Sequence, residues 1–183
     1  MRGIATTLAL TILGVGAAQA QERLAHPTEP GFILGFDKAS ASQSIKEWVP
    51  KGESVERWTR MLTFQRFTGT IQQGQMPAGL LDWISNQIKI VCPGAQTSAV
   101  APGGGFGRTG ARLKTVCPLN RETGKPETTF YRAFAGAKDM HVAQVAFRSR
   151  PDAASEAWAT GFLDKILICG TAQADAQPLC KAR

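Results

Sequence analysis

Beyond its first twenty residues the chain lacks any long apolar run, and it has few of the side chains that carry catalysis. It contains only two histidines, His26 and His141, and its four cysteines show no C-x-x-C spacing. The missing apolar run excludes a membrane-spanning helix in the mature chain. The scattered cysteines and histidines exclude the usual zinc-binding patterns.

The first twenty residues are typical of a secretory signal peptide. Arg2 precedes an apolar run, and Ala18 and Ala20 form an A-x-A cleavage site. We therefore predict a signal peptide over residues 1–20, cleavage after Ala20, and a single periplasmic domain over residues 21–183. An uncleaved anchor fits less well, because the run is short for a bilayer and has no apolar continuation.

All four cysteines, Cys92, Cys117, Cys169 and Cys180, lie after the predicted cleavage point. An even number of cysteines in an exported chain favours two disulfides, and four cysteines allow three pairings. We prefer Cys92 with Cys117 and Cys169 with Cys180, because neighbours in sequence close short loops between adjacent elements. A metal site with all four cysteines as ligands is the weaker alternative.

Basic residues are concentrated in one region of the chain. Without Arg2 the mature chain holds 20 lysines and arginines against 14 acidic residues, and residues 105–150 hold nine against three. This segment alone accounts for the excess of six. Such a region could dock an acidic protein or contact anionic lipid head groups peripherally. Export and the shortage of stacking aromatic residues argue against nucleic acid. The alternative is that these basic residues are solvent-exposed charges at strand edges, where they oppose pairing with other strands.

Hydrophobic periodicity predicts an α+β fold. Alternating patterns predict six strands: Phe32–Phe36, Ser44–Val49, Trp58–Phe67, Gly110–Cys117, Thr128–Ala135 and Met140–Arg148. Helical patterns predict two amphipathic helices, from Pro77 to about Val91 and from about Pro151 to Cys169. Because the strands follow one another through short turns, we predict a twisted antiparallel sheet of about six strands covered by two helices.

The stretch EWVPKGESVERW, residues 47–58, combines two tryptophans with a Pro-Lys-Gly turn. The turn chemistry at residues 50–52 predicts a chain reversal between two strands. Exposed together, Trp48 and Trp58 would form a binding surface for sugar or protein. The alternative, which we favour, is that they pack under the two helices with the other two tryptophans.

No group of side chains forms a recognisable catalytic site. Gly105–Gly110 matches G-x-G-x-x-G, but a strand pattern follows it, so we interpret it as a mobile hairpin tip. Glu47, Glu53 and Glu56 lie among basic residues, which indicates local ion pairs and not an acid–base pair. His141 shares a strand side with apolar residues and is expected to be packed. We predict no enzyme activity, no cofactor and no metal.

Part of this chain resembles known proteins. Glu47-Trp48-Val49-Pro50, Gly52-Glu53, Trp58-Thr59 and Met61 resemble a recurring stretch in small exported proteobacterial proteins of unassigned function. This resemblance covers about twenty residues. The order of elements is also similar to that of PsbP-like domains, although the disulfides are not part of that family's pattern. The second resemblance implies an α/β sandwich that binds partner proteins and does not catalyse a reaction.

Together these features predict a non-enzymatic periplasmic protein that binds another envelope protein. It would act as an accessory subunit or assembly factor, for example of an oxidoreductase complex or a secretion system. The residues assigned to docking are Arg108, Arg112, Lys114, Arg132, Trp48 and Trp58.

Two alternatives stay open. One is a binding module for a small anionic ligand or a glycan, using the same arginines and tryptophans. The other is a hydrolase of unfamiliar architecture, whose only candidate residues are Glu47, Glu53 and His141.

Overall fold

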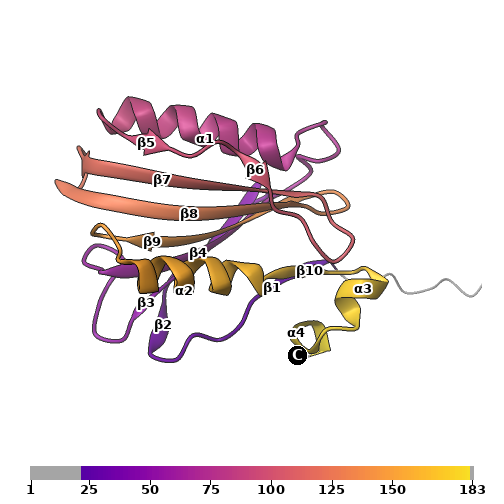
Figure 1. Cartoon of the computed structure of the whole chain (residues 1–183). Coiled ribbons are helices and arrows are strands. Elements are labelled where there is room, and N and C mark those ends of the chain that lie inside the picture. Colours follow the sequence, from indigo (N-terminus) through magenta and orange to yellow (C-terminus); the bar gives the residue numbers. More distant parts are fainter. Residues whose placement is uncertain (1–21, 182–183) are drawn as a thin grey trace, which may run out of the picture.

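The computed structural model describes residues 22–181 and consists mainly of one large antiparallel sheet (Figure 1). The predicted signal peptide and its cleavage site lie outside the described residues. In spatial order the strands are β2 (Phe32–Ala39), β3 (Gln43–Pro50), β4 (Arg60–Phe67), β9 (Met140–Phe147), β8 (Lys125–Ala135), β7 (Gly110–Asn120) and β5 (Gln96–Thr97), with β6 (Ala101–Pro102) also on β7. The predicted α+β class is confirmed, with eight strands in this sheet instead of about six.

The remaining elements are four helices and a second, two-stranded sheet. The helices are α1 (Pro77–Val91), α2 (Ala153–Asp164), α3 (Ala172–Asp175) and α4 (Pro178–Lys181). The small sheet pairs β1 (Arg23–Ala25) with β10 (Leu167–Cys169). Within the described residues, no helix is both long and apolar enough to cross a membrane.

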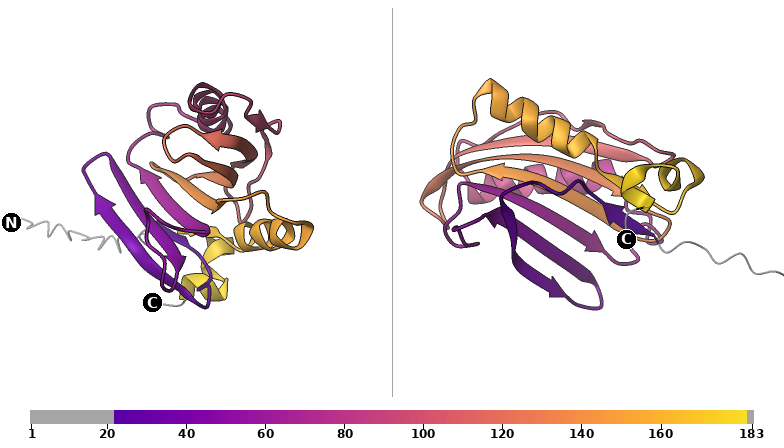
Figure 2. Two further views of the ribbon diagram at one scale, coloured as in Figure 1. Left: turned by 90° about the vertical axis from the view of Figure 1, so that its left-hand side faces the viewer. Right: turned by 90° about the horizontal axis from the view of Figure 1, so that it is seen from below.

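The two long helices cover opposite faces of the large sheet (Figure 2). Successive side chains of a strand point to opposite faces. On β8, Phe130 and Phe134 therefore pack in the core under α2, whereas Tyr131 and Ala133 pack in the core under α1. The core under α2 is built mainly on β4, β8 and β9, and the core under α1 on β7, β8 and β9. At the β2–β3 hairpin, Phe32 packs its ring against Trp158 of α2, with centroids 6.4 Å apart.

Helix α1 has the bounds that its sequence pattern predicts. Pro77 begins it, where the missing N–H costs nothing, and Leu81 is fully buried against the sheet. The Cys92–Cys117 disulfide joins its C-terminal end to β7. Trp83 lies on the outer side and is 59% exposed, so the expectation that all four tryptophans pack under the helices is wrong.

Helix α2 is shorter than its sequence pattern predicts. Asp152 caps it by accepting a hydrogen bond from the Ser155 backbone N–H at 2.8 Å. The predicted continuation to Cys169 is wrong, because Leu167–Cys169 forms β10 and pairs with β1. The partner strand comes from the opposite end of the chain, and local periodicity carries no signal of it.

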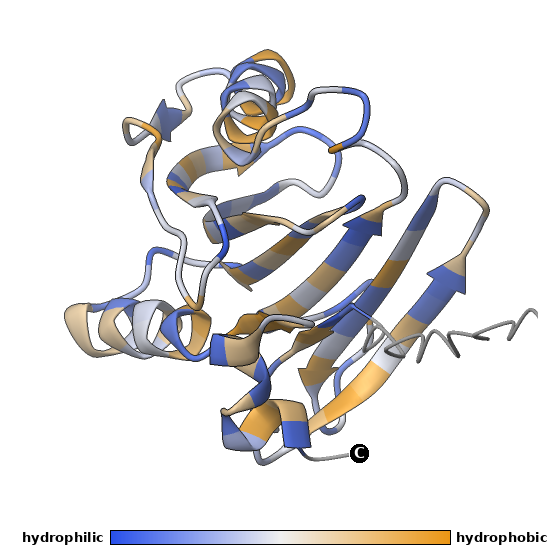
Figure 3. Ribbon diagram, turned by 90° about the vertical axis from the view of Figure 1, so that its right-hand side faces the viewer, coloured by the Kyte–Doolittle hydropathy of each residue, from blue (hydrophilic) through white to orange (hydrophobic). Residues whose placement is uncertain are grey.

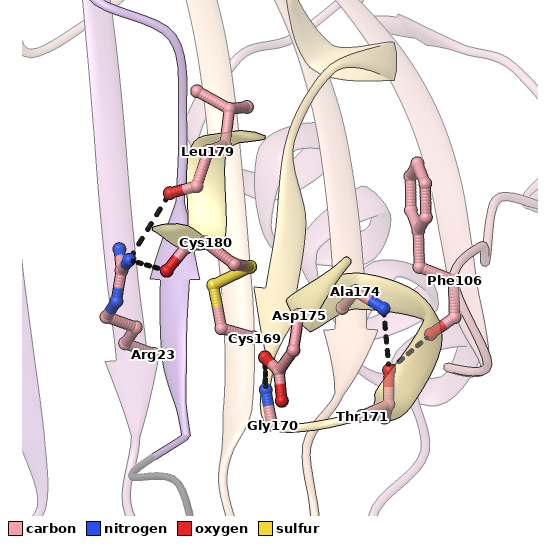
Figure 4. The surroundings of a disulfide bond; sticks show 9 residues. All are labelled: Arg23, Phe106, Cys169, Gly170, Thr171, Ala174, Asp175, Leu179 and Cys180. Carbon is pink, nitrogen blue, oxygen red and sulfur yellow. Dashed lines mark hydrogen bonds between the residues drawn. A yellow bond between two sulfur atoms is a disulfide. The ribbon is translucent and has the colours of Figure 1, made fainter. Parts of the chain in front are cut away.

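The second predicted disulfide, Cys169–Cys180, is also present and ties the C-terminal tail to β10 (Figure 4). Around it, Arg23 of β1 donates hydrogen bonds to the backbone carbonyls of Leu179 and Cys180. Asp175 accepts from the backbone N–H of Gly170 at 2.8 Å. The two ends of the described chain are therefore fastened to each other.

Trp58 also departs from the expected pattern. The predicted strand begins at Arg60, so the alternation of β4 does not extend back to Trp58. Its ring packs with Val49, Met61 and Ala146, in a different core cluster from Leu62. The turn before it is held by Glu53, whose carboxylate accepts from the backbone N–H of Thr59 at 2.6 Å. The stretch is thus a structural corner, as predicted.

Arg132 connects three separate parts of the structure. It lies on β8, is 3% exposed, and donates hydrogen bonds to four backbone carbonyls: those of Gly103, Gly104, Leu163 and Ile166. The last two carbonyls lie at the C-terminal end of α2, which has no basic residue in its own last turn. The guanidinium thus satisfies carbonyls that a helix end leaves unpaired and complements its dipole.

We predict that Arg132→Met lowers the free energy of unfolding by about 3 kcal/mol or more, because buried carbonyls lose a charged donor. The matched control is Arg112→Met, whose ion pair with Asp164 is partly exposed and should contribute less than about 1 kcal/mol. Urea unfolding measures both. Equal, small losses in the two variants would contradict the assigned role of Arg132.

Candidate functional site

The basic residues assigned to docking are engaged with other elements of the same chain. Three of them form ion pairs: Arg108 with Glu22, Arg112 with Asp164, and Lys114 with Glu156. Two of these carboxylates belong to α2 and one precedes β1. Three of the nine basic residues of the 105–150 segment are therefore paired within the fold. A docking role for these three residues stays a prediction.

The other docking candidates lie partly or wholly in the interior. Arg132 and Trp58 are buried, so neither presents a side chain to a partner in this structure. Trp48 is half-buried on β3, and its Nε1 has no hydrogen-bond partner. These six residues do not form one continuous surface.

The candidate hydrolase residues do not converge. Glu47 pairs with Thr63 on β4, whereas His141 pairs with Arg66, so Glu47 and His141 point to opposite faces of the sheet. Glu53 is used by the turn before β4. These three residues therefore form no acid–base pair.

The glycine-rich loop is a hairpin tip, as predicted, in which the backbones of Gly105 and Arg108 pair. It is anchored to other elements, however, so the expectation of a mobile tip is corrected. Its Gly103 and Gly104 carbonyls accept from Arg132, and the Phe106 carbonyl accepts from the Thr171 hydroxyl at 2.9 Å. Phe106 has a φ of 54° and packs near the Cys169–Cys180 disulfide. Local glycine content gave no signal of these contacts, because every partner is distant in sequence.

A possible cation-binding cluster near the C-terminus is explained by the disulfide. Cys169, Asp175 and Cys180 bring their side-chain ligand atoms close together. Both sulfurs are bonded to each other, and the Asp175 carboxylate accepts from Gly170. These groups stabilise the tail and are not assigned to a metal.

The two edges of the large sheet differ. At one edge, β7 is covered by β5 and β6, which have two residues each, and by further bonds such as Ser98 N–H to the Lys114 carbonyl at 2.9 Å. At the other edge, the eight-residue strand β2 pairs only with β3 among the described residues. Short, covered edges resist pairing with other chains, whereas long open edges invite it.

Strand β2 also exposes apolar side chains along this open edge. Ile33 and Leu34 are each 43% exposed, and Phe36 is 38% exposed. Figure 3 shows β2 as the outermost strand of the sheet, hydrophobic in its first half. The sequence indicated this feature through the continuous apolar run Phe32–Leu34. A strand with one solvent-exposed face should instead alternate apolar and polar residues.

A cavity of about 440 Å³ lies between β1 and the face of the sheet formed by β3, β4 and β9. Its lining residues are Glu22, Arg23, Leu24, His26, Ser44, Lys46, Phe64, Gln65, Arg66 and His141. It contains both histidines of the chain, which the sequence places on unrelated elements. The β1–β10 pairing brings the N-terminal segment over the sheet, and sequence reasoning missed this site for that reason.

Burial controls the charge of His141. The residue is 2% exposed, and burial lowers its pKa to about 4; Arg66 and Arg108 act in the same direction and Asp139 opposes them. Burial likewise lowers the pKa of His26, although its hydrogen bond to the Pro27 carbonyl opposes this. His141 is therefore neutral at pH 7.

Comparison with known proteins identifies no family. No family model matches the chain, and no curated protein matches it. Among solved structures, the chain is similar to LpqN, described as involved in cell envelope biogenesis of Mycobacterium tuberculosis. The identity is 15%, the TM-score is 0.46, and the match covers 84% of this chain and 87% of LpqN. No functional conclusion follows from a likeness this distant. The resemblance of the stretch around Trp48 to exported proteobacterial proteins stays a prediction.

The low pKa of His141 predicts a loss of stability in mild acid. The unfolded state binds a proton near pH 6.5 and the folded state only near pH 4. Above pH 6.5 His141 is neutral in both states and does not change the stability. As the pH drops from 6.5 towards 4, only the unfolded state is protonated, so the free energy of unfolding falls by about 3 kcal/mol. Urea unfolding at pH 7 and pH 4 should show this extra loss in the wild type and not in His141→Gln. Parallel losses in both proteins would contradict the assignment.

Proposed function

We propose that this protein is a non-enzymatic periplasmic protein that binds another envelope protein through the open edge of β2. It would serve that partner as an accessory subunit or assembly factor. Its two disulfides support an oxidising compartment, where such bonds persist. The single observation that carries the proposal is an eight-residue edge strand with exposed Ile33, Leu34 and Phe36.

Backbone pairing is the form of recognition that this edge favours. An unpaired strand edge presents N–H and C=O groups that an extended segment of another protein can join as an added strand. Exposed apolar side chains on both faces of β2 would then pack against alternate residues of the added strand. The register shift between Leu34 and Phe36 bends β2 locally, so an added strand would pair along the apolar part that precedes it.

The charged half of the edge gives the partner's orientation. Beyond Phe36 the strand carries Asp37 and Lys38, and Asp37 already pairs with Lys46 at 3.1 Å. The apolar half is therefore the centre of the contact and the charged half its rim. Rim charges tune the rate and specificity of association more than its strength.

The absence of enzymatic activity is part of the same proposal. The candidate acid and base residues, Glu47, Glu53 and His141, do not meet in the structure. The four cysteines are consumed in disulfides, so they supply no thiolate nucleophile.

The proposal predicts that Ile33→Lys abolishes partner binding, because a lysine on the edge opposes strand addition and removes the apolar contact. Ile90→Lys on the outer face of α1 is the matched control, since Ile90 is 67% exposed and far from β2. Tagged proteins are crosslinked in cells and purified from the native envelope. One stoichiometric partner should accompany the wild type and Ile90→Lys but not Ile33→Lys.

The contrary results are equally clear. Retention of the same partner by a folded Ile33→Lys protein would exclude the β2 edge as the docking site. A wild-type protein that purifies without any stoichiometric partner would overturn the proposed function itself.

A further inference from the structure

We propose that the cavity beneath β1 binds a small organic anion, a molecule with a carboxylate or phosphate group on a flat apolar body. This site uses different residues from the β2 edge. The proposal does not depend on the proposed protein partner.

The floor of the cavity is built from neighbouring residues of three strands. Ser44, Arg66 and His141 form one cross-strand row, and Lys46 and Phe64 form part of the next row. Directly paired residues of antiparallel strands hold their Cβ atoms about 5 Å apart. Lys46 and Arg66 are diagonal neighbours in adjacent rows, about 7 Å apart, so both cationic side chains lie on one face of the sheet beside the ring of Phe64.

An aromatic group forms the wall at the Phe64 end. The ring of His26 stacks on Phe64, with centroids 4.0 Å apart and planes 10° from parallel. Trp48 meets His26 edge-on at 6.1 Å, and Leu24 of β1 adds an aliphatic surface. This wall suits a planar apolar body, while the basic residues suit an anionic head group.

The cavity also gathers buried side-chain nitrogens that lack hydrogen-bond partners. Arg66 Nε and His141 Nε2 have no hydrogen-bond partner, and both residues line the cavity. Two further unpartnered nitrogens are neighbours: Trp48 Nε1, beside His26, and Arg108 Nε, beside Glu22. Buried polar groups without partners are rare and costly, so this concentration calls for an explanation. An oxyanion supplies the acceptors that this region lacks.

The charges around the cavity favour an anion. Its lining includes Arg23, Lys46 and Arg66 against a single carboxylate, Glu22. Glu22 is already neutralised by Arg108 at 2.5 Å. Lys46 pairs with Asp37 on its exposed side, and the contact of Arg66 with Asp139 is long, at 3.7 Å. Arg66 is thus the cation least compensated by its neighbours.

The size of the cavity sets the class of ligand. A volume of about 440 Å³ lies at the lower end of small-molecule sites, which span roughly 300–1,000 Å³. It accommodates a compound of about one ring with its anionic group. A folded protein or a glycan chain does not fit such a volume.

The test is calorimetric titration with benzoate, phenyl phosphate and the neutral isostere benzamide at fixed ionic strength. We expect saturable binding of at least one of the two anions and at least about tenfold weaker binding of benzamide. Comparing benzoate with phenyl phosphate shows whether the site prefers a carboxylate or a phosphate group. No saturable binding of either anion up to about 10 mM, or equal binding of benzamide, would overturn the proposal.

Two arginine variants locate the site. Arg66→Gln should weaken binding of the preferred anion about tenfold or more, whereas Arg112→Gln, which removes an arginine outside the cavity, should leave it unchanged. Unfolding of each variant without ligand confirms that it is folded. Equal affinity of Arg66→Gln and wild type would place the anion elsewhere. Neither result alters the partner test at Ile33, so the two proposals fail independently.

Discussion

The guanidinium of Arg132 joins a strand, a helix end and a glycine-rich loop by donating to four backbone carbonyls. Burial lowers the pKa of Arg132 to about 10, with Arg112 adding to the decrease and Asp164 opposing it, so the side chain stays charged at neutral pH. A buried charge with these partners fixes their relative positions, because any displacement leaves it unsatisfied. The orientation of α2, and through it of β10 and β1, follows from this contact.

This contact belongs to one well-braced half of the molecule. Helices α1 and α2, the Cys92–Cys117 disulfide and the β1–β10 pair all surround β7, β8 and β9. The rest of the sheet is covered only in part. Helix α2 reaches β2 and β4 through ring contacts to Phe32 and Phe64. Beyond these contacts, β2 forms an open edge with exposed Ile33 and Leu34. A rigid frame thus presents both an edge suited to another chain and, under β1, a basic cavity suited to a small anion.

Sequence patterns predicted those features of the fold that depend on residues close together in the chain. The bounds of α1, the turn before β4 and both disulfides could all be anticipated. They could not predict β10, because its partner Arg23–Ala25 lies at the other end of the chain. The same long-range pairing creates the cavity. The basic residues appeared as a docking surface because sequence does not show that Glu22, Glu156 and Asp164 neutralise three of them.

Hydrogen–deuterium exchange, measured residue by residue on the purified protein, tests most directly whether the central strands are covered while the β2 edge is open. The account predicts slow exchange through β8 and β9, where both faces are covered. It predicts fast exchange for those β2 amides that point away from β3, and protection of these same amides when the native partner is bound. Uniform slow exchange across β2 in the isolated protein would show that the edge is already occupied, and would contradict the account.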